Sequence, residues 1–238
     1  MTTYDLYLES GPKHRKTMVH VPELLGCVAV GPTTAAALEA TPEAIAAFRR
    51  FRHRHGEQIN VDVMIQTRIA EHITEGQMLG EGMPYLTLPI DLIPLKDGDI
   101  EHSLIRLGWL NDELGRWSAA QPTATLDDRP EKGQAASGIL LHVLGAQGSY
   151  LASAFGSAPG FGPIHRRAER GEIPLAVALQ ESIDLCNEHV ARSTPDQRQG
   201  VRQMKGYVYT LHKALRRMNE HAWEHLAELS RRPNGPEL

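Results

Sequence analysis

The stretch "LHKALRRMNEHAWEHLAEL", residues 211–229, decides how the C-terminal half of this chain folds. Its apolar side chains recur every three or four residues, which predicts one face of a helix running from about residue 201 to 229. His221 and His225 lie on this face, in consecutive layers with Leu215, Met218 and Leu229. A buried imidazole needs partners for its ring nitrogens, and each unmet group costs about 1–3 kcal/mol. The stretch therefore predicts a packing helix whose histidines need special partners.

A divalent metal ion would satisfy these histidines, because neutral imidazoles at positions i and i+4 of a helix can reach one ion. The third ligand must then come from another helix. His142, within the apolar run "ILLHVLGAQ", is the natural candidate. The alternative is a set of hydrogen-bonded structural histidines, since one H-x-x-x-H pair is unsurprising in a chain with 12 histidines.

Helical periodicity extends back from this stretch to about Pro94. Three further amphipathic helices are expected from the apolar stripes Leu104–Trp117, Ile139–Tyr150 and Leu175–Val190. The Gly/Pro-rich segment 156–174 is too long for a simple turn and is expected to be a crossover loop. Residues 96–238 are thus predicted to form an all-α four-helix bundle with one long crossover.

Residues 1–95 are predicted to form a separate α+β domain. Strands are expected at 4–10, 17–22, 26–31 and 60–69, with a weaker candidate at 83–92. The helix between the third and fourth strands is expected to have Thr41 as N-cap, Pro42 at its first position and Gly56 as its stop.

Composition narrows the function classes. A net charge of −4 argues against a general affinity for nucleic acid or anionic membranes. No window approaches 18 consecutive apolar residues, and the N-terminal residues do not have the pattern of a signal peptide. Cys27 and Cys186 are far apart in sequence and are expected to be buried, reduced thiols. The chain is therefore expected to be cytoplasmic, without membrane attachment.

The segments "LLHVLGAQGSYL" and "RRMNEHAWEHLAEL" resemble the DinB-like superfamily, which is grouped with bacillithiol and mycothiol S-transferases. The resemblance covers residues 98–238 and implies a four-helix bundle that holds a divalent metal through His142, His221 and His225. It further implies a low-molecular-weight thiol as cosubstrate. Two departures bear on catalysis: Gln147 stands where many relatives carry Glu, and the tryptophan common before the second helix is missing.

The stretch "VPELLGCVAVGPTTAAAL" resembles the HicB-like antitoxin domain, over about residues 4–55. In that family the domain binds a small ribonuclease toxin, and DNA binding belongs to a separate C-terminal module that is not evident here. The resemblance therefore implies a binding or dimerisation module. The basic cluster "RRFRHRH" at 49–55 could contact RNA phosphates, although a solvated helix end is the expectation we favour.

Together these features predict a cytosolic metal-dependent enzyme of the S-transferase or hydrolase type, with zinc or nickel at the three histidines. The expected partners are a small thiol, an electrophilic small molecule and a second copy of the chain in a homodimer. The alternative is a non-catalytic regulator whose HicB-like half engages a protein or RNA. Glu220 and Glu224 could orient the ligand histidines, but we favour solvated charges; His165, His189 and His212 are expected at the surface.

Overall fold

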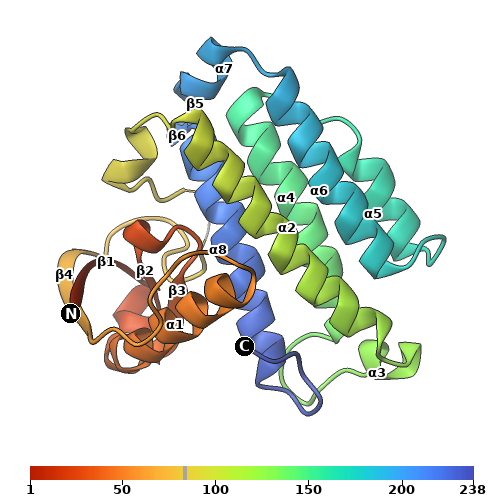
Figure 1. The fold of residues 1–238 in the computed structure, drawn as a ribbon, viewed down its shortest axis with the longest axis horizontal. Coiled ribbons are helices and arrows are strands. Elements are labelled where there is room, and N and C mark those ends of the chain that lie inside the picture. The colour runs from red at the N-terminus through yellow and green to blue at the C-terminus, as the bar shows by residue number, and fades with distance from the viewer. Residues whose placement is uncertain (83–84) are drawn as a thin grey trace.

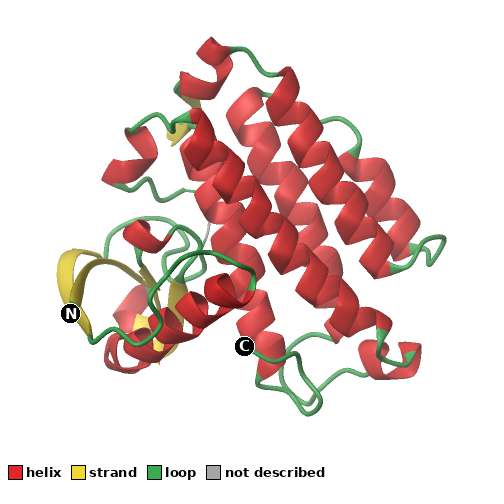
Figure 2. Ribbon diagram, in the orientation of Figure 1, coloured by secondary structure: helices red, strands yellow, loops and turns green. Residues whose placement is uncertain are grey.

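The computed structural model describes residues 1–82 and 85–238, and its N-terminal half is built on a four-stranded mixed sheet (Figures 1 and 2). The sheet order is β3-β2-β1-β4, with β1 (Thr2–Ser10), β2 (Arg15–His20), β3 (Val28–Thr33) and β4 (Ile65–Ile73). β2 is antiparallel to both β1 and β3, whereas β4 is parallel to β1. The connection that this parallel pair requires contains helix α1 (Thr34–Arg54). The α+β pattern predicted for this half is confirmed.

Helix α1 begins earlier than the sequence suggested. The Thr33 side chain accepts a hydrogen bond from the Ala36 amide at 3.2 Å, so Thr33 and not Thr41 is the N-cap. Pro42 lies inside the helix, and the Thr41 hydroxyl donates to the Ala37 carbonyl. The alanine-rich segment before the proline favours helix strongly enough to extend it back by two turns. The predicted stop is confirmed, since Gly56 has a φ of 93°.

The segment between β4 and the helical half also differs from expectation. The fourth strand is displaced towards the C-terminus, and residues 89–92 form a 3-10 helix, η3 (Pro89–Leu92), instead of a strand. Pro89 starts this turn, and the Asp91 carboxylate accepts a hydrogen bond from the Leu88 amide at 2.8 Å. Residues 83 and 84, the start of the weaker strand prediction, lie outside the described residues.

Four long helices fill the C-terminal half: α2 (Asp97–Ala119), α4 (Ala136–Phe155), α6 (Leu175–Arg192) and α8 (Leu211–Ser230). Helices α2 and α4 each pack against both α6 and α8. Short helices α3 (Thr123–Asp127) and α7 (Pro195–Gln199) lie in the connections. Within the described ranges, no helix combines the length and apolarity needed to cross a membrane. The structure thus shows a small mixed sheet followed by a helical region.

Two connections contain structure that the sequence analysis missed. The segment expected to be a crossover loop contains α5 (Phe161–Glu169), whose Phe161, Ile164 and Ala168 are buried on one face. The last helix begins ten residues later than predicted, after a hairpin of β5 (Arg202–Met204) and β6 (Tyr207–Tyr209). Lys205 and Gly206, both with positive φ, form the two-residue turn that such hairpins favour.

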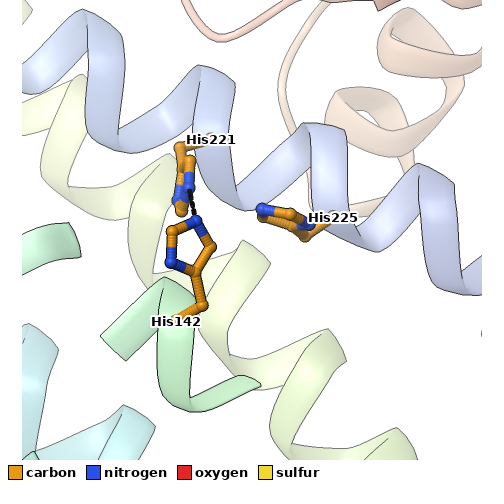
Figure 3. A group of neighbouring side chains, drawn as sticks. All are labelled: His142, His221 and His225. Carbon is orange, nitrogen blue, oxygen red and sulfur yellow. Dashed lines mark hydrogen bonds between the residues drawn. The ribbon is translucent and has the colours of Figure 1, made fainter. Parts of the chain in front are cut away.

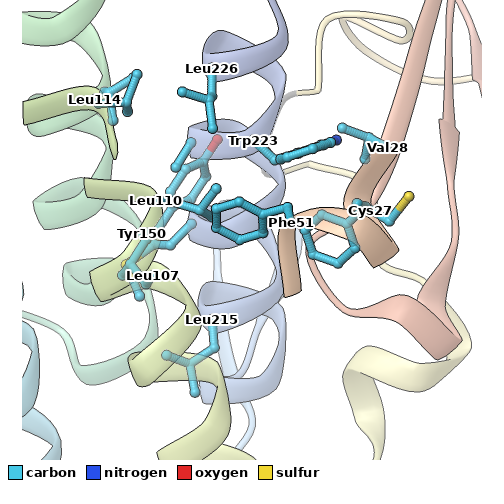
Figure 4. Packing of buried hydrophobic residues seen from close by; sticks show 14 of the residues in the cluster. Cys27, Val28, Phe51, Leu107, Leu110, Leu114, Tyr150, Leu215, Trp223 and Leu226 are labelled. Carbon is cyan, nitrogen blue, oxygen red and sulfur yellow. The ribbon is translucent and has the colours of Figure 1, made fainter. Parts of the chain in front are cut away.

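Helix α8 packs against both halves of the molecule. Trp223 places its ring 4.9 Å from Phe48 and 5.5 Å from Phe51 of α1, measured between centroids, while Leu226 faces the long helices (Figure 4). One cluster of buried apolar side chains therefore runs from the sheet to α6. The division into domains at residue 95 stays a prediction. Cys27 and Cys186 are buried within this cluster, as predicted, and burial raises the pKa of Cys186 to about 12.

Buried charges form a second link between the halves. The Arg216 guanidinium binds the Asp91 carboxylate of η3 at 2.7 Å and the Glu220 carboxylate at 2.7 Å. Glu220 also lies 3.1 Å from His20 of β2, and His20 lies 3.4 Å from Glu9 of β1. All five side chains are at most 2% exposed. Charges at this depth are tolerated only when they are paired, so these bonds fix α8 against the sheet and η3.

Removing one member of this cluster is expected to destabilise the protein strongly. Arg216→Met would leave Asp91 and Glu220 buried with one cation fewer, which costs about 3–5 kcal/mol in the free energy of unfolding. Arg116→Met is the matched control, because Arg116 is 61% exposed and its pair with Asp112 contributes less than about 1 kcal/mol. Urea titrations followed by circular dichroism give both values; equal losses would contradict this account.

The same cluster predicts a pH dependence. Burial disfavours the charged His20 imidazole, but Glu220 and Glu9 outweigh this penalty and raise the pKa of His20 above its ordinary 6.5. A raised folded-state pKa gives stability that is complete below pH 6.5 and is lost as the pH rises through the folded-state pKa. The difference in unfolding free energy between the natural protein and His20→Gln should therefore fall as the pH rises above 6.5, by about 1.4 kcal/mol per unit of pKa increase.

This difference is measured by urea unfolding with a chelator present. His53→Gln, at an exposed position of α1, provides the control and should give no such slope. A difference that stays constant over this range would show that His20 is not held in its charged form.

Candidate metal centre

His142, His221 and His225 converge between α4 and α8, as the sequence predicted (Figure 3). One ring nitrogen from each lies within 4.8 Å of the other two. The Nε2 atoms of His142 and His221 are 3.0 Å apart, and the three ring centroids are separated by 4.6–5.3 Å. The two α8 histidines are one helical turn apart and project towards the middle of α4, which supplies the third ring.

The ring of His225 is oriented by a residue that the sequence analysis missed. Glu228 accepts a hydrogen bond from His225 Nδ1 at 3.0 Å and is itself held by Arg232 at 3.0 Å. This contact leaves Nε2 of His225 for the cluster. A carboxylate behind a ligand imidazole fixes its tautomer and increases its basicity. The i+3 spacing of Glu228 from His225 was the signal available in the sequence.

The electrostatics of the cluster favour neutral imidazoles. Burial, followed by the neighbouring His225 and His142 rings and Arg217, holds the pKa of His221 well below 6.5. Burial and His225 also lower the pKa of the more exposed His142. Neutral imidazole is the form that binds a metal ion. Three converging nitrogen donors suit zinc, nickel or another borderline transition metal better than magnesium or calcium, which prefer oxygen.

A cavity of about 430 Å³ opens beside the cluster, and His142 and His221 form part of its wall. The other walls come from Glu81 and Gly82 after β4, from Ser149 and Tyr150 of α4, and from His165 of α5. His165 is partly buried there, so its expected surface position was wrong. A three-histidine site with an adjacent cavity can hold a metal ion and admit a further ligand.

Arg217 connects the cavity to the buried charges. Arg217 donates a hydrogen bond to the Gly82 carbonyl, and the Gly82 amide donates to Glu9 at 3.1 Å. The Arg217 guanidinium carbon also lies 5.9 Å from the centre of the Tyr150 ring. The arginine that precedes His221 by one turn therefore holds one wall of the cavity in place.

Other expected roles near the site need correction. Glu220 is neither solvated nor bonded to a ligand histidine, because Arg216, Arg217 and His20 bind it. Glu224 is partly buried and faces a different cavity. His212 is buried and binds the Ile93 carbonyl through Nδ1 at 2.8 Å, so it is not a surface residue. His189 is partly buried and binds the Pro159 carbonyl.

Most of the basic residues in the cluster 49–55 form hydrogen bonds or ion pairs with other residues of this chain. Arg49 is buried and binds the Tyr4 hydroxyl, Arg52 pairs with Glu57, and Arg54 and His55 both reach Glu113 of α2. The favoured expectation of a solvated helix end was therefore wrong for Arg49, Arg52 and His55, whereas Arg50, His53 and Arg54 are exposed. The bonds of Arg54 and His55 to Glu113 tie the end of α1 to the helical region.

Comparisons of this chain with models of known protein families, with curated proteins and with solved structures found no match in any of the three. The DinB-like and HicB-like resemblances therefore stay expectations. The geometry of the histidine cluster is the feature that points to a function.

Replacing one ligand should separate metal binding from folding. His225→Ala is expected to abolish binding of one zinc or nickel ion per chain, because two imidazoles hold such ions much more weakly than three. The fold should persist, since alanine favours helix and the position is only partly buried. Metal content after dialysis, measured by atomic emission, tests this.

His102→Ala is the control, because His102 is exposed on α2. His212→Ala would not serve, because it would remove a buried hydrogen bond to the Ile93 carbonyl as well as an imidazole. Equal metal loss from His102→Ala and His225→Ala would refute the assignment.

Proposed function

We propose that this chain is a metal-dependent enzyme of the S-transferase or hydrolase type, acting at His142, His221 and His225. The observation that carries the proposal is the convergence of three imidazoles beside a cavity of about 430 Å³. Structural metal sites are closed by four protein ligands, whereas catalytic sites leave a position for water or substrate. The long helices that hold these residues are proposed to be a DinB-like four-helix bundle, and the sheet with α1 a HicB-like module.

The three imidazoles would hold a divalent ion, zinc or nickel by preference. When bound, the ion supplies Lewis acidity and lowers the pKa of a water or thiol that reaches it. Glu228 orients His225, and Arg217 fixes Gly82 and lies against Tyr150 at the cavity wall. The imidazole of His165 and the hydroxyl of Ser149 offer hydrogen bonds to a substrate in the cavity.

Gln147, which stands where many members of the proposed family carry Glu, has a structural role in this chain. Gln147 is buried between helices, where its amide donates to Asn111 at 2.7 Å and its carbonyl accepts from the Ser182 hydroxyl at 2.5 Å. Its side chain therefore links α4 to α2 and α6. This residue supports the packing of the helix that carries His142.

The function is tested with the full chain loaded with zinc or nickel. Conjugation of 2-mercaptoethanol to 1-chloro-2,4-dinitrobenzene tests the transferase, and cleavage of 4-nitrophenyl acetate tests the hydrolase. We expect one of these rates to exceed that of free metal, to fall at least about 100-fold in His225→Ala, and to be unchanged in His102→Ala. A protein that binds one metal ion but accelerates neither reaction would favour the non-catalytic regulator.

A further inference from the structure

A second cavity, of about 480 Å³, lies where β3, α1 and α8 meet. Its walls are mainly apolar and small: Val28 and Val30 from β3, Ala44 and Ala47 from α1, and Trp223 from α8. Cavities of this size with mostly apolar walls and a few polar groups are typical of small-molecule sites. The histidine cluster does not line this cavity, whose α8 residues lie on a neighbouring face of the helix.

Glu224 is the polar group that distinguishes this cavity. Its side chain is partly buried in the wall, yet among residues 1–82 and 85–238 no hydrogen bond or ion pair reaches its carboxylate. Among the described residues, a few buried side-chain atoms lack both a partner and access to solvent, such as Asn219 Oδ1. The carboxylate oxygens of Glu224 are not among them, so they remain accessible to solvent. The carboxylate therefore faces the open space of the cavity.

The other charged groups at the cavity are mostly neutralised by the chain itself. Arg50 pairs with Glu43 at 2.7 Å, Lys16 pairs with Glu81, and Glu228 binds His225 and Arg232. Arg231 is exposed at the rim. Glu224 is thus the side-chain carboxylate of the wall that no ion pair within the described residues neutralises, and an ionised carboxylate in apolar surroundings is best satisfied by a cationic donor.

We infer that this cavity binds a small molecule with an apolar body and a protonated amine that donates hydrogen bonds to Glu224. The apolar body lies against Trp223, Val28 and Ala44. The site is separate from the metal centre, because none of the three histidines lines it, although Glu228 contacts both.

The inference is tested by calorimetry on the full chain with n-octylamine, n-octanol and octanoate, which share one apolar chain and differ in head group. A chelator is present, so that the amine cannot bind a metal ion at the histidines. Octylamine should bind at least about 10-fold more tightly than the other two, the effect expected of a charge-assisted hydrogen bond. Failure of octylamine to bind at 1 mM, or equal affinity for all three, would overturn the inference.

Variants identify the group responsible. Glu224→Gln should remove at least about 10-fold of the amine preference while changing octanol affinity less than about threefold. Glu39→Gln is the charge-matched control, since Glu39 is exposed on α1 and does not line the cavity, and it should leave the preference intact. Ala44→Phe should weaken all three ligands by filling the cavity. Equal effects of the two glutamine variants would show attraction to surface charge only, and would refute the site.

Discussion

The pairing of Arg216 and Arg217 with Glu220 inside the protein is the constraint on which the rest of the structure depends. Guanidinium groups at 1–2% exposure must find partners, which come from Glu220, η3 and the segment after β4, and Glu220 in turn binds His20 of β2. The Arg216 bonds to Asp91 and Glu220 are each 2.7 Å long. The rotation and height of α8 relative to the sheet are therefore fixed by charge, in addition to the apolar contacts of Trp223 with α1.

The same buried charges also determine the position of the candidate metal centre. His221 follows Glu220 in sequence and His225 lies one turn further, so fixing the charged turn of α8 also fixes where both imidazoles point. The third histidine depends on α4, which is held against α2 and α6 by the Gln147, Asn111 and Ser182 hydrogen bonds. Metal sites need ligands placed within a few tenths of an ångström, and both helices here have buried polar anchors that supply such precision.

The convergence of the three histidines was predictable from sequence, because His221 and His225 lie at helical spacing on an apolar stripe and His142 lies in the apolar run of another helix. The buried charges were not: Glu220 was expected to be solvated, because His20, Asp91 and Gly82, which bind this turn of α8, are separated from it by more than a hundred residues. The surface position predicted for His212 was wrong for the same reason, because its partner, the Ile93 carbonyl, is also distant in sequence. The predicted start of α1 at Thr41 was wrong for a local reason, because the alanine-rich segment before Pro42 is itself helical and Thr33 caps it.

Helix α8 contributes wall residues to two cavities on neighbouring faces, and Glu228 lies where those faces meet. Its carboxylate orients His225 of the metal centre, and the same side chain lines the cavity that contains Glu224. A cation bound beside Glu224 would compete with His225 and Arg232 for the negative charge of Glu228, which would weaken the hold on the His225 ring. Because coupling between two binding sites is reciprocal, a metal ion at the histidines would then lower the affinity for an amine by the same factor. The sign of this coupling follows from the arrangement of the two carboxylates along one helix.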